Sequence, residues 1–266
     1  MLNSEIEISA IIIAKNEEYN IGRCLESLKD CIEDIVVLVD DQTNDKTIEI
    51  IRTFPAVRFY VINWKGYAKT KQYAVSLTKN EWILWIDADE ALTDKLKTEI
   101  NNFKTSVPKH SAYSMPRKAY FLDKWIKHCG WYPGRVTRLF KKKKAQFSDK
   151  QVHEHLVVDG SIGEFSADLN HFTDPDIKHY FKKFNEYTSL AAEDLLNGER
   201  KFKIFDLIFR PAIIFIKMYF IKLGFLDGIE GFILSIFSSL YVFTKYCKFW
   251  ELKKGKTKNG NRKPTD

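Results

Sequence analysis

Two aspartates, Asp87 and Asp89, follow a short apolar run and form the clearest candidate for metal-dependent chemistry. The segment reads WILWIDADE, so the apolar run ends in a D-x-D pair. In an extended segment, alternate side chains point to the same side, and both carboxylates can then serve one cation. Carboxylate oxygens suit Mg²⁺ or Mn²⁺, and such a cation neutralises the charge that develops on a departing diphosphate. The pair therefore indicates a metal site for a diphosphate-bearing substrate.

Acidic and basic residues after other apolar runs predict contacts to a nucleotide. Asp40 and Asp41 close the run IVVLV, where a carboxylate can accept hydrogen bonds from a uracil imide or a ribose hydroxyl. Asp and Asn also cap their own backbone in turns, so part of this loop is structural, and Asp45 is the first candidate for that role. Glu17, after the first run, is expected near the base, and Lys71 is expected to pair with the diphosphate.

A transfer to a hydroxyl group also needs a general base. Glu154, in the segment VHEH, is the first candidate because a carboxylate is already deprotonated at neutral pH, and Asp123 is the second. The H-E-H spacing does not match the H-E-x-x-H zinc motif. Arg135 and Arg138 fit two alternatives equally, a clamp for a diphosphate or an anionic acceptor, and ion pairs at the surface.

The elements that must position these residues alternate between strands and helices. Runs typical of strands lie at 8–14, 35–39, 57–62 and 82–86, and the first two have the β-branched pattern of a strand buried on both faces. Helices are predicted at 19–29, 47–54 and 68–78. This alternation predicts an α/β fold with a Rossmann-like, doubly wound, mostly parallel sheet. Ligands bind at the carboxyl ends of such strands, so loops 15–17, 40–45 and 87–90 should meet at one edge.

The sequence predicts four regions along the chain. Residues 1–110 are expected to form the nucleotide-sugar-binding half, and residues 111–175 an acceptor-side half or lid. Residues 176–252 are expected to form a helical region with amphipathic and apolar helices, which are separated near Asp227 and Gly228. The lysine-rich residues 253–266 are expected to form a disordered tail.

Charge is concentrated in the C-terminal part of the chain. Residues 177–266 hold 17 Lys and Arg against 9 Asp and Glu, whereas residues 1–176 hold 25 against 26. The basic residues flank apolar stretches, which favours an anionic membrane surface over a nucleic acid as partner. The longest charge-free stretch there, residues 231–244, has 14 residues, fewer than the roughly 20 that span a bilayer, so the prediction is a peripheral, monotopic protein.

The N-terminal residues and the cysteines indicate where the protein is located. The first eight residues carry two glutamates and lack the basic and apolar regions of a signal peptide, which predicts a location on the cytoplasmic side. The four cysteines form neither a C-x-x-C pair nor a metal-ligand spacing with histidine, and reduced, packed thiols are therefore expected.

Several runs resemble the donor-binding half of family 2 glycosyltransferases with the GT-A fold: AIIIAKNEEYNIGRCLESL, VVLVDDQTNDKTIEI and EWILWIDADEALT. Later runs, among them PRKAYFLDKWIKHCGWYPGRVTRLF, VHEHLVVDG and IKLGFLDGIEGFILSIFSSLYVFTKY, resemble one branch more narrowly. That branch is the lipopolysaccharide inner-core β-1,4-glucosyltransferase-like group. The resemblance extends to about residue 250. It implies an inverting transfer of a sugar, glucose above all, from a UDP-sugar to a lipid-linked saccharide at the cytoplasmic face of the inner membrane.

Carried over residue by residue, the resemblance implies the following site. Nucleotide contacts fall on Ala14, Lys15, Glu17 and Asp41, a diphosphate contact on Lys71, and metal contacts on Asp87 and Asp89. Asp40, Asp87, Ala88, Arg135 and Arg138 are further candidates for the nucleotide-sugar site, and Glu154, with Asp123 in reserve, is the candidate base. The chain departs from the branch in three places. Asp41-Gln42-Thr43 replaces a Ser-Gly-Ser loop, Cys129 replaces glycine, and Lys71 replaces an arginine whose bidentate fork a lysine cannot form.

Three other functions compete with sugar transfer. A nucleotidyltransferase would carry a glycine-rich phosphate loop early in the chain, and residues 8–20 contain no glycine. A dinucleotide-binding oxidoreductase would show G-x-G-x-x-G after the first strand, and it is absent there. The third alternative is a membrane scaffold that binds sugar nucleotides without turning them over. Release of UDP from a UDP-sugar separates an enzyme from such a scaffold.

Overall fold

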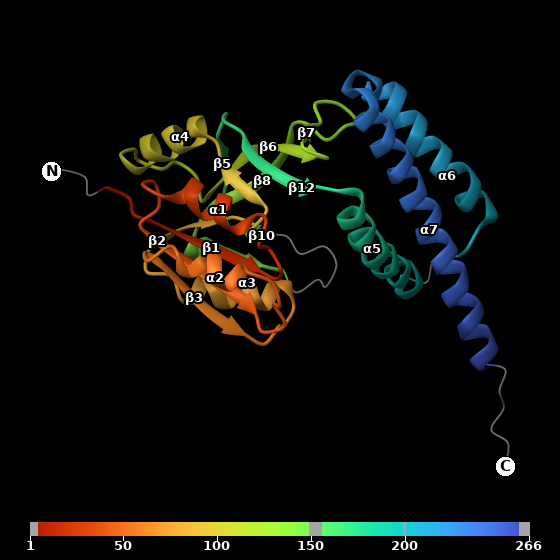
Figure 1. Ribbon diagram of the computed structural model, residues 1–266, viewed down its shortest axis with the longest axis horizontal. Helices are drawn as coiled ribbons and strands as arrows, with labels where there is room; N and C mark the ends of the chain where they lie inside the picture. Colours follow the sequence, from red (N-terminus) through yellow and green to blue (C-terminus); the bar gives the residue numbers. More distant parts are fainter. Residues whose placement is uncertain (1–4, 149–155, 199–200, 261–266) are drawn as a thin grey trace, which may run out of the picture. The chain divides into compact units, whose positions relative to one another are not determined.

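The structure is a computed structural model that describes residues 5–148, 156–198 and 201–260. Its chain divides into two compact units (Figure 1). The first comprises Met1–Ala119 and Pro133–Thr173, and the second comprises Tyr120–Tyr132 and Asp174–Asp266. The two halves expected at residues 1–110 and 111–175 thus lie mainly in one unit, whereas residues 120–132 cluster with the C-terminal helices.

The first unit begins with a parallel sheet. Its strands are β1 (Ile8–Ala14), β2 (Asp34–Asp40), β3 (Val57–Ile62) and β4 (Trp82–Trp85), in the order β3-β2-β1-β4. The side chains of β2 are buried along its whole length, as are almost all of those of β1, because both strands lie inside the sheet. β3 is the edge strand and is mostly half-buried. All four predicted strands are confirmed.

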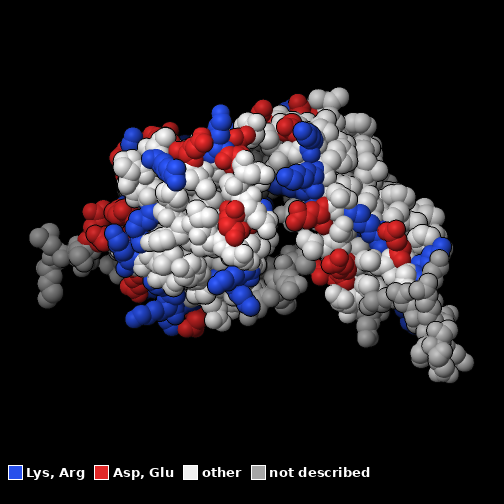
Figure 2. Space-filling model, turned by 60° about the horizontal axis from the view of Figure 1, so that its bottom comes forward, with Lys and Arg blue, Asp and Glu red and all other residues white. Residues whose placement is uncertain are grey.

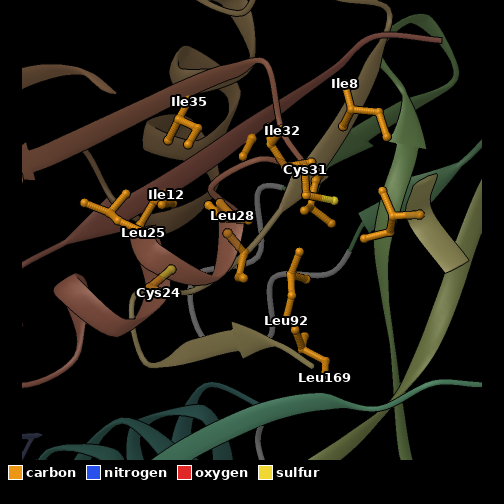
Figure 3. Packing of buried hydrophobic residues seen from close by; sticks show 14 of the residues in the cluster. Ile8, Ile12, Cys24, Leu25, Leu28, Cys31, Ile32, Ile35, Leu92 and Leu169 are labelled. Atoms are coloured by element: carbon orange, nitrogen blue, oxygen red, sulfur yellow. The ribbon is translucent and has the colours of Figure 1, made fainter. Parts of the chain in front are cut away.

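Helices cover the parallel strands and build the main core. They are α1 (Ile21–Leu28), α2 (Thr47–Arg52), α3 (Tyr67–Ser76) and α4 (Asp94–Lys104). α1 buries Cys24, Leu25 and Leu28 at helical spacing, and these side chains pack with Ile12 of β1 and with Leu92 (Figure 3). This apolar layer holds the helices against the strands and so fixes the positions of the polar loops at the strand ends.

An antiparallel part extends the sheet beyond β4. Its strands are β5 (Glu90–Leu92), β6 (Ala112–Phe121), β8 (Gly134–Lys141) and β12 (Leu169–Asp174), and β11 (Ile162–Glu164) pairs with β6 in parallel. After the turn η1 (Lys142–Lys144), β9 (Ala145–Phe147) and β10 (Leu156–Val158) form a separate two-stranded sheet. The order continues β4-β8-β6-β12-β5, with β8 antiparallel to β4. The pairing of β12 with β5 places His171 opposite Glu90. On the face shown in Figure 2, basic and acidic side chains are interspersed.

The second unit is a helical assembly. It contains the two-residue strand β7 (Lys124–Trp125), α5 (Ile177–Asn197), α6 (Ile204–Ile216), the π-helical turn η2 (Lys217–Ile221), the short 3-10 helix η3 (Gly224–Asp227) and α7 (Gly228–Gly260). The buried carboxylate of Asp227 accepts hydrogen bonds from the backbone N–H groups of Lys127 and His128, which docks the segment 120–132 on the helices.

α7 continues beyond the predicted end of the helical region. Residues 253–260 are helical, so the expectation of a disordered tail starting at residue 253 is wrong for them. Four of these eight residues are lysines, which are good helix formers, and the glycines, threonine and asparagine among them are tolerated because adding residues to an existing helix costs far less than nucleating a new one. Residues 261–266 lie outside the described part of the chain.

One buried carboxylate at the amino end of β2 supports the packing of the parallel strands. Asp34 is 4% exposed and accepts hydrogen bonds from Ser9 Oγ at 2.7 Å, Lys79 N at 2.9 Å and Arg58 Nη2 at 2.7 Å. Burial favours the protonated acid, but these hydrogen bonds outweigh it and lower the pKa of Asp34.

We expect Asp34→Asn to reduce the free energy of unfolding by about 2 kcal/mol at neutral pH, because a charged acceptor is lost. A depressed carboxyl pKa contributes stability above the unfolded value of about 3.9, and this contribution disappears as pH falls through the lower folded value. Urea denaturation of both proteins at several pH values should therefore show their difference shrinking below about pH 4. A difference that stays constant from neutral to acid pH would contradict this assignment.

Candidate active site

The first two polar loops meet at the carboxyl ends of β1 and β2. Lys15 Nζ lies 3.0 Å from Asp40 Oδ2 and donates to Gln42 Oε1 at 2.9 Å. Asp40 is 2% exposed, so its carboxylate is committed to holding these loops together. Asp41 is exposed and accepts from Asn63 Nδ2 at 3.3 Å. Of the two neighbouring aspartates, Asp41 is therefore the one accessible to a ligand.

Two more residues of these loops have clear structural surroundings. Asp45 accepts hydrogen bonds from Glu18 N at 3.0 Å, from Thr47 N at 3.0 Å and from Thr47 Oγ1 at 2.5 Å, so it stabilises the turn as predicted. Glu17 accepts from Asn20 Nδ2 at 3.0 Å, and its own N–H donates to Thr47 Oγ1 at 2.8 Å. Ala14 is buried at the end of β1, directly before Lys15.

The D-x-D segment is a tight turn rather than an extended strand. Glu90 N donates to the carbonyl oxygen of Asp87 at 2.9 Å, and Asp87 N donates to Glu90 Oε2 at 3.0 Å. The expectation that Asp87 and Asp89 point to one side rested on an extended segment, whereas the segment is a turn in which the two carboxylates have different neighbours. Ala88, between them, is 4% exposed.

Arg138 of β8 joins the two acids at the ends of this turn. Its Nη2 lies 2.5 Å from Asp87 Oδ2 and 2.6 Å from Glu90 Oε1. The side chains of Arg138 and Glu90 are 3% and 0% exposed, whereas that of Asp87 is 33% exposed. The guanidinium therefore closes the inner side of the turn and leaves one carboxylate partly accessible.

The indole of Trp85 lies between two cations and orients the same carboxylate. Lys71 Nζ lies 3.8 Å and Arg138 Cζ 4.0 Å from the ring centroid. Trp85 Nε1 donates to Asp87 Oδ1 at 3.0 Å, and Lys71 Nζ lies 4.0 Å from the same oxygen. Cations at these distances are attracted to the indole face, so Trp85 holds Lys71 close to the turn.

Asp89 belongs to a second arrangement. His171 Nε2 lies 3.4 Å from Asp89 Oδ2, and both side chains are 15% exposed. The backbone pairing of β12 with this segment, in which Phe172 N donates to Asp89 O at 2.8 Å, sets that approach. An oxygen and an imidazole nitrogen thus lie together beside the Asp87 cluster.

The cluster separates the two acids of the turn electrostatically. Burial acts against ionisation of Asp87, but the neighbouring Arg138 and Lys71 cations outweigh it and hold the pKa of this carboxyl well below its usual range. For Glu90, burial is the larger effect, and the negative Asp87 adds to it, so its pKa is raised despite Arg138. The same surroundings thus shift the pKa values of the two carboxyls in opposite directions.

The other predicted residues lie in different surroundings. Arg135 Nη2 donates to the carbonyl oxygens of Ser114 at 3.0 Å and Phe165 at 2.8 Å, so its guanidinium supports the backbone there. Asp123 belongs to the second unit and, at a φ of 60°, forms the turn between β6 and β7. Glu154 lies outside the described residues.

Three functional candidates were missed by sequence reasoning. Glu90 directly follows the D-x-D pair, and a charged residue at the start of the buried strand β5 was the available signal. Trp85 was taken only as part of an apolar run. His171 is 82 residues from Asp89 in the sequence, and only the pairing of β12 with β5 brings them together, so no local pattern could reveal it.

The donor set fits a hard divalent cation that shares its coordination with a substrate. Within the described ranges, His, Cys, Asp and Glu form no group of three or more that could hold a metal alone. Mg²⁺ is commonly bound by one or two protein ligands, with phosphate oxygens and waters completing the shell. Asp89 supplies one such carboxylate and His171 an imidazole nitrogen, which first-row transition metals accept more readily than Mg²⁺, whereas Asp87 is engaged by Arg138, Lys71 and Trp85.

Comparisons with known proteins identify the class. The model of the family described as glycosyl transferase family 2 matches residues 9–172. A lipopolysaccharide core biosynthesis glycosyltransferase, LpsC, of Rhizobium meliloti is 28% identical over 258 residues, which are 93% of each chain. An uncharacterized glycosyltransferase of Rickettsia typhi is 32% identical over 257 residues, or 92% of this chain and 87% of the relative.

The solved structures agree on the fold. A mannosyltransferase from Pyrobaculum calidifontis, solved with GDP-Man and Mn²⁺, aligns with a TM-score of 0.53 at 12% identity and covers 93% of this chain and 88% of its own. The chain belongs to glycosyl transferase family 2 and has the GT-A fold. It is a glycosyltransferase, which decides against the nucleotidyltransferase, oxidoreductase and scaffold alternatives.

We expect Arg138→Met to lower the free energy of unfolding by about 3 to 5 kcal/mol, because it leaves buried Glu90 without its counter-ion. The double variant Arg138→Met with Glu90→Met should recover part of this loss, since well-packed apolar groups replace both charges. Urea denaturation measures both values. Lys144→Met, which breaks an exposed pair with Asp159, is the control and should leave stability nearly unchanged. A double variant less stable than the single one would contradict the account.

Proposed function

We propose that the protein is an inverting glycosyltransferase that moves a sugar, glucose above all, from a UDP-sugar to a lipid-linked saccharide. The observation that carries the proposal is the pairing of Asp89 with His171 beside the Arg138-held Asp87, at the carboxyl ends of the parallel strands. Ligands of open α/β sheets bind at this edge. The similarity to LpsC supports an acceptor in lipopolysaccharide core or a related cell-envelope glycan.

Each loop has a role in holding the donor. Asp41 is exposed next to the Lys15–Asp40 pair, where a base or ribose would lie. Glu17 follows β1 at the same edge of the sheet. Lys71, held over Trp85, is close enough to Asp87 to reach a diphosphate bound at the turn. Mg²⁺ or Mn²⁺ bound by Asp89 and His171 would supply charge neutralisation for the leaving diphosphate.

The transfer itself is a displacement at the anomeric carbon. The acceptor hydroxyl oxygen forms a bond to C1 of the sugar, the bond from C1 to the diphosphate oxygen breaks, and the electron pair leaves with UDP. A general base takes the hydroxyl proton, and attack opposite the leaving group inverts the configuration. Glu154 is proposed as this base and Asp123 as its alternative.

The reaction is proposed to take place at the cytoplasmic face of the inner membrane, with the protein bound peripherally. A lipid-linked acceptor requires the enzyme to work close to the bilayer surface. The basic, apolar character of the C-terminal unit supports such a location.

Asp89→Asn should keep the fold and remove most transferase activity, because a neutral amide is a poorer metal ligand than a carboxylate. UDP release and anomer-resolved NMR of the product measure turnover and inversion. Excess EDTA should have the same effect on the unsubstituted enzyme. Undiminished turnover in either experiment would rule out the metal role, and a product that retains the donor's anomeric configuration would rule out inversion.

Glu154→Gln should lower the transfer rate by about 10² to 10⁴-fold while UDP binding changes little, because only proton removal from the acceptor is lost. Asp123→Asn is the matched variant, since it also turns a carboxylate into an amide. Single-turnover transfer and UDP titration are the two measurements. A larger loss in Asp123→Asn than in Glu154→Gln would assign the base to Asp123 instead.

A further inference from the structure

The outward face of α6 and the turn η2 is apolar where a water-exposed helix is polar. Its large exposed side chains recur at helical spacing, and each is between 50% and 68% exposed: Ile204, Phe205, Ile208, Phe209, Ile213, Ile216, Phe220 and Ile221. A helix on the surface of a soluble protein places polar residues at such positions. We call this set the α6 apolar face.

α7 adds a second stripe to the same unit. Its exposed large apolar side chains are Ile229, Phe232, Leu240, Phe243 and Trp250, separated by three, seven or eight residues, as on one side of a helix. α6 and α7 pack on each other and still leave these side chains exposed. Contiguous exposed apolar surface of this kind marks a site for a protein partner or a membrane.

The charges around the α6 apolar face favour an anionic lipid surface. Residues 201–255 contain nine Lys and Arg and four Asp and Glu. Asp206 and Asp227 are buried, and Glu230 is paired with Lys124 at 2.8 Å, so the exposed charge is mainly positive. A symmetric contact with a second copy would bring these positive surfaces together, whereas anionic headgroups would neutralise them.

A hollow on these helices combines the two chemistries that a phospholipid requires. It has a volume of about 560 Å³ and lies between α6 and α7. Its lining includes the apolar side chains of Phe205, Phe209 and Ile213, the basic side chain of Lys245, and Arg210 paired with Asp206 at 2.5 Å. Apolar walls suit an acyl chain, and the Lys245 cation suits a phosphate group.

The packing of α7 argues that these helices lie on the bilayer rather than cross it. By length and composition, Gly224–Gly255 could span a membrane, although core helices of soluble proteins pass the same test. Lys248 Nζ lies 2.7 to 2.9 Å from four oxygen atoms of α5, on Asn185, Thr188 and Ser189, and its three N–H groups donate among them. α5 carries three lysines and three acids, so a crossing α7 would draw a charged helix into the hydrocarbon.

We propose that the α6 apolar face is a membrane-docking surface that inserts into the interfacial layer of an anionic bilayer, with the helix axis parallel to the membrane plane. Lys203 and Lys217, exposed at the two ends of α6, extend to the headgroups while their stems remain against apolar surface. This inference concerns a surface outside the donor site and does not depend on the donor or acceptor sugar.

The test is flotation of the full chain with vesicles of phosphatidylcholine alone or of phosphatidylcholine with phosphatidylglycerol. We expect binding to the anionic vesicles that weakens from about 0.1 M to about 1 M salt, as the Debye length shrinks. Ile213→Glu should reduce the bound fraction on the order of tenfold, because it places a charge in the inserted face. Lys203→Gln with Lys217→Gln should weaken binding to anionic vesicles, and the binding that remains should depend less on salt concentration.

Val107→Glu is the matched control, because Val107 is 73% exposed on the first unit, and it should bind vesicles as the unsubstituted protein does. Circular dichroism and UDP binding verify that each variant is folded, so a failure of the donor site is scored separately from a failure of docking. Equal binding by Ile213→Glu, or no binding to any vesicle, would overturn the proposal. Resistance to carbonate extraction would instead show insertion across the bilayer, and a dimer that Ile213→Glu dissociates without lipid would show that a second copy covers this face.

Discussion

The ion cluster of Arg138 with Asp87 and Glu90 is the interaction on which the proposed site depends. A buried cation and carboxylate are costly to desolvate, and only close, multiple hydrogen bonds offset that cost. Here one guanidinium from β8 satisfies both acids of the turn after β4, with Nη2 at 2.5 and 2.6 Å from them. Because β4 and β8 are antiparallel neighbours, the same contact joins the parallel and antiparallel parts of the sheet at its ligand-binding edge.

The cluster also gives the two aspartates of the D-x-D pair different roles. Asp87 is fixed by Trp85 and by two cations, so it orders the turn and keeps Lys71 nearby. Asp89 lies beside His171 and has the ligand chemistry for a cation shared with phosphates. Two acids that are two positions apart in sequence thus meet different partners, because a turn rather than a strand separates them.

The sequence predicts the parallel strands closely, because a strand buried on both faces leaves an uninterrupted β-branched run such as ISAIIIA. Loops after such strands must meet at one edge, and the contact of Lys15 with Asp40 bears this out. The roles of Arg138 and His171 could not be read locally, since strand pairing across 51 and 82 residues positions them. Arg135, three residues from Arg138, has the same side chain but donates to backbone carbonyl oxygens. Only the structure distinguishes the roles of these two arginines.

The proposed site binds a nucleotide diphosphate through a cation that the protein and the phosphates share. A thermal-shift measurement with UDP, in Mn²⁺ or in EDTA, tests this directly, because a ligand that binds only the folded state must raise its stability. At a concentration 100 times the dissociation constant the gain is about 2.7 kcal/mol. We expect a clear rise in Tm with UDP and Mn²⁺ together and a much smaller rise with UDP in EDTA. An equal rise in both conditions would contradict it.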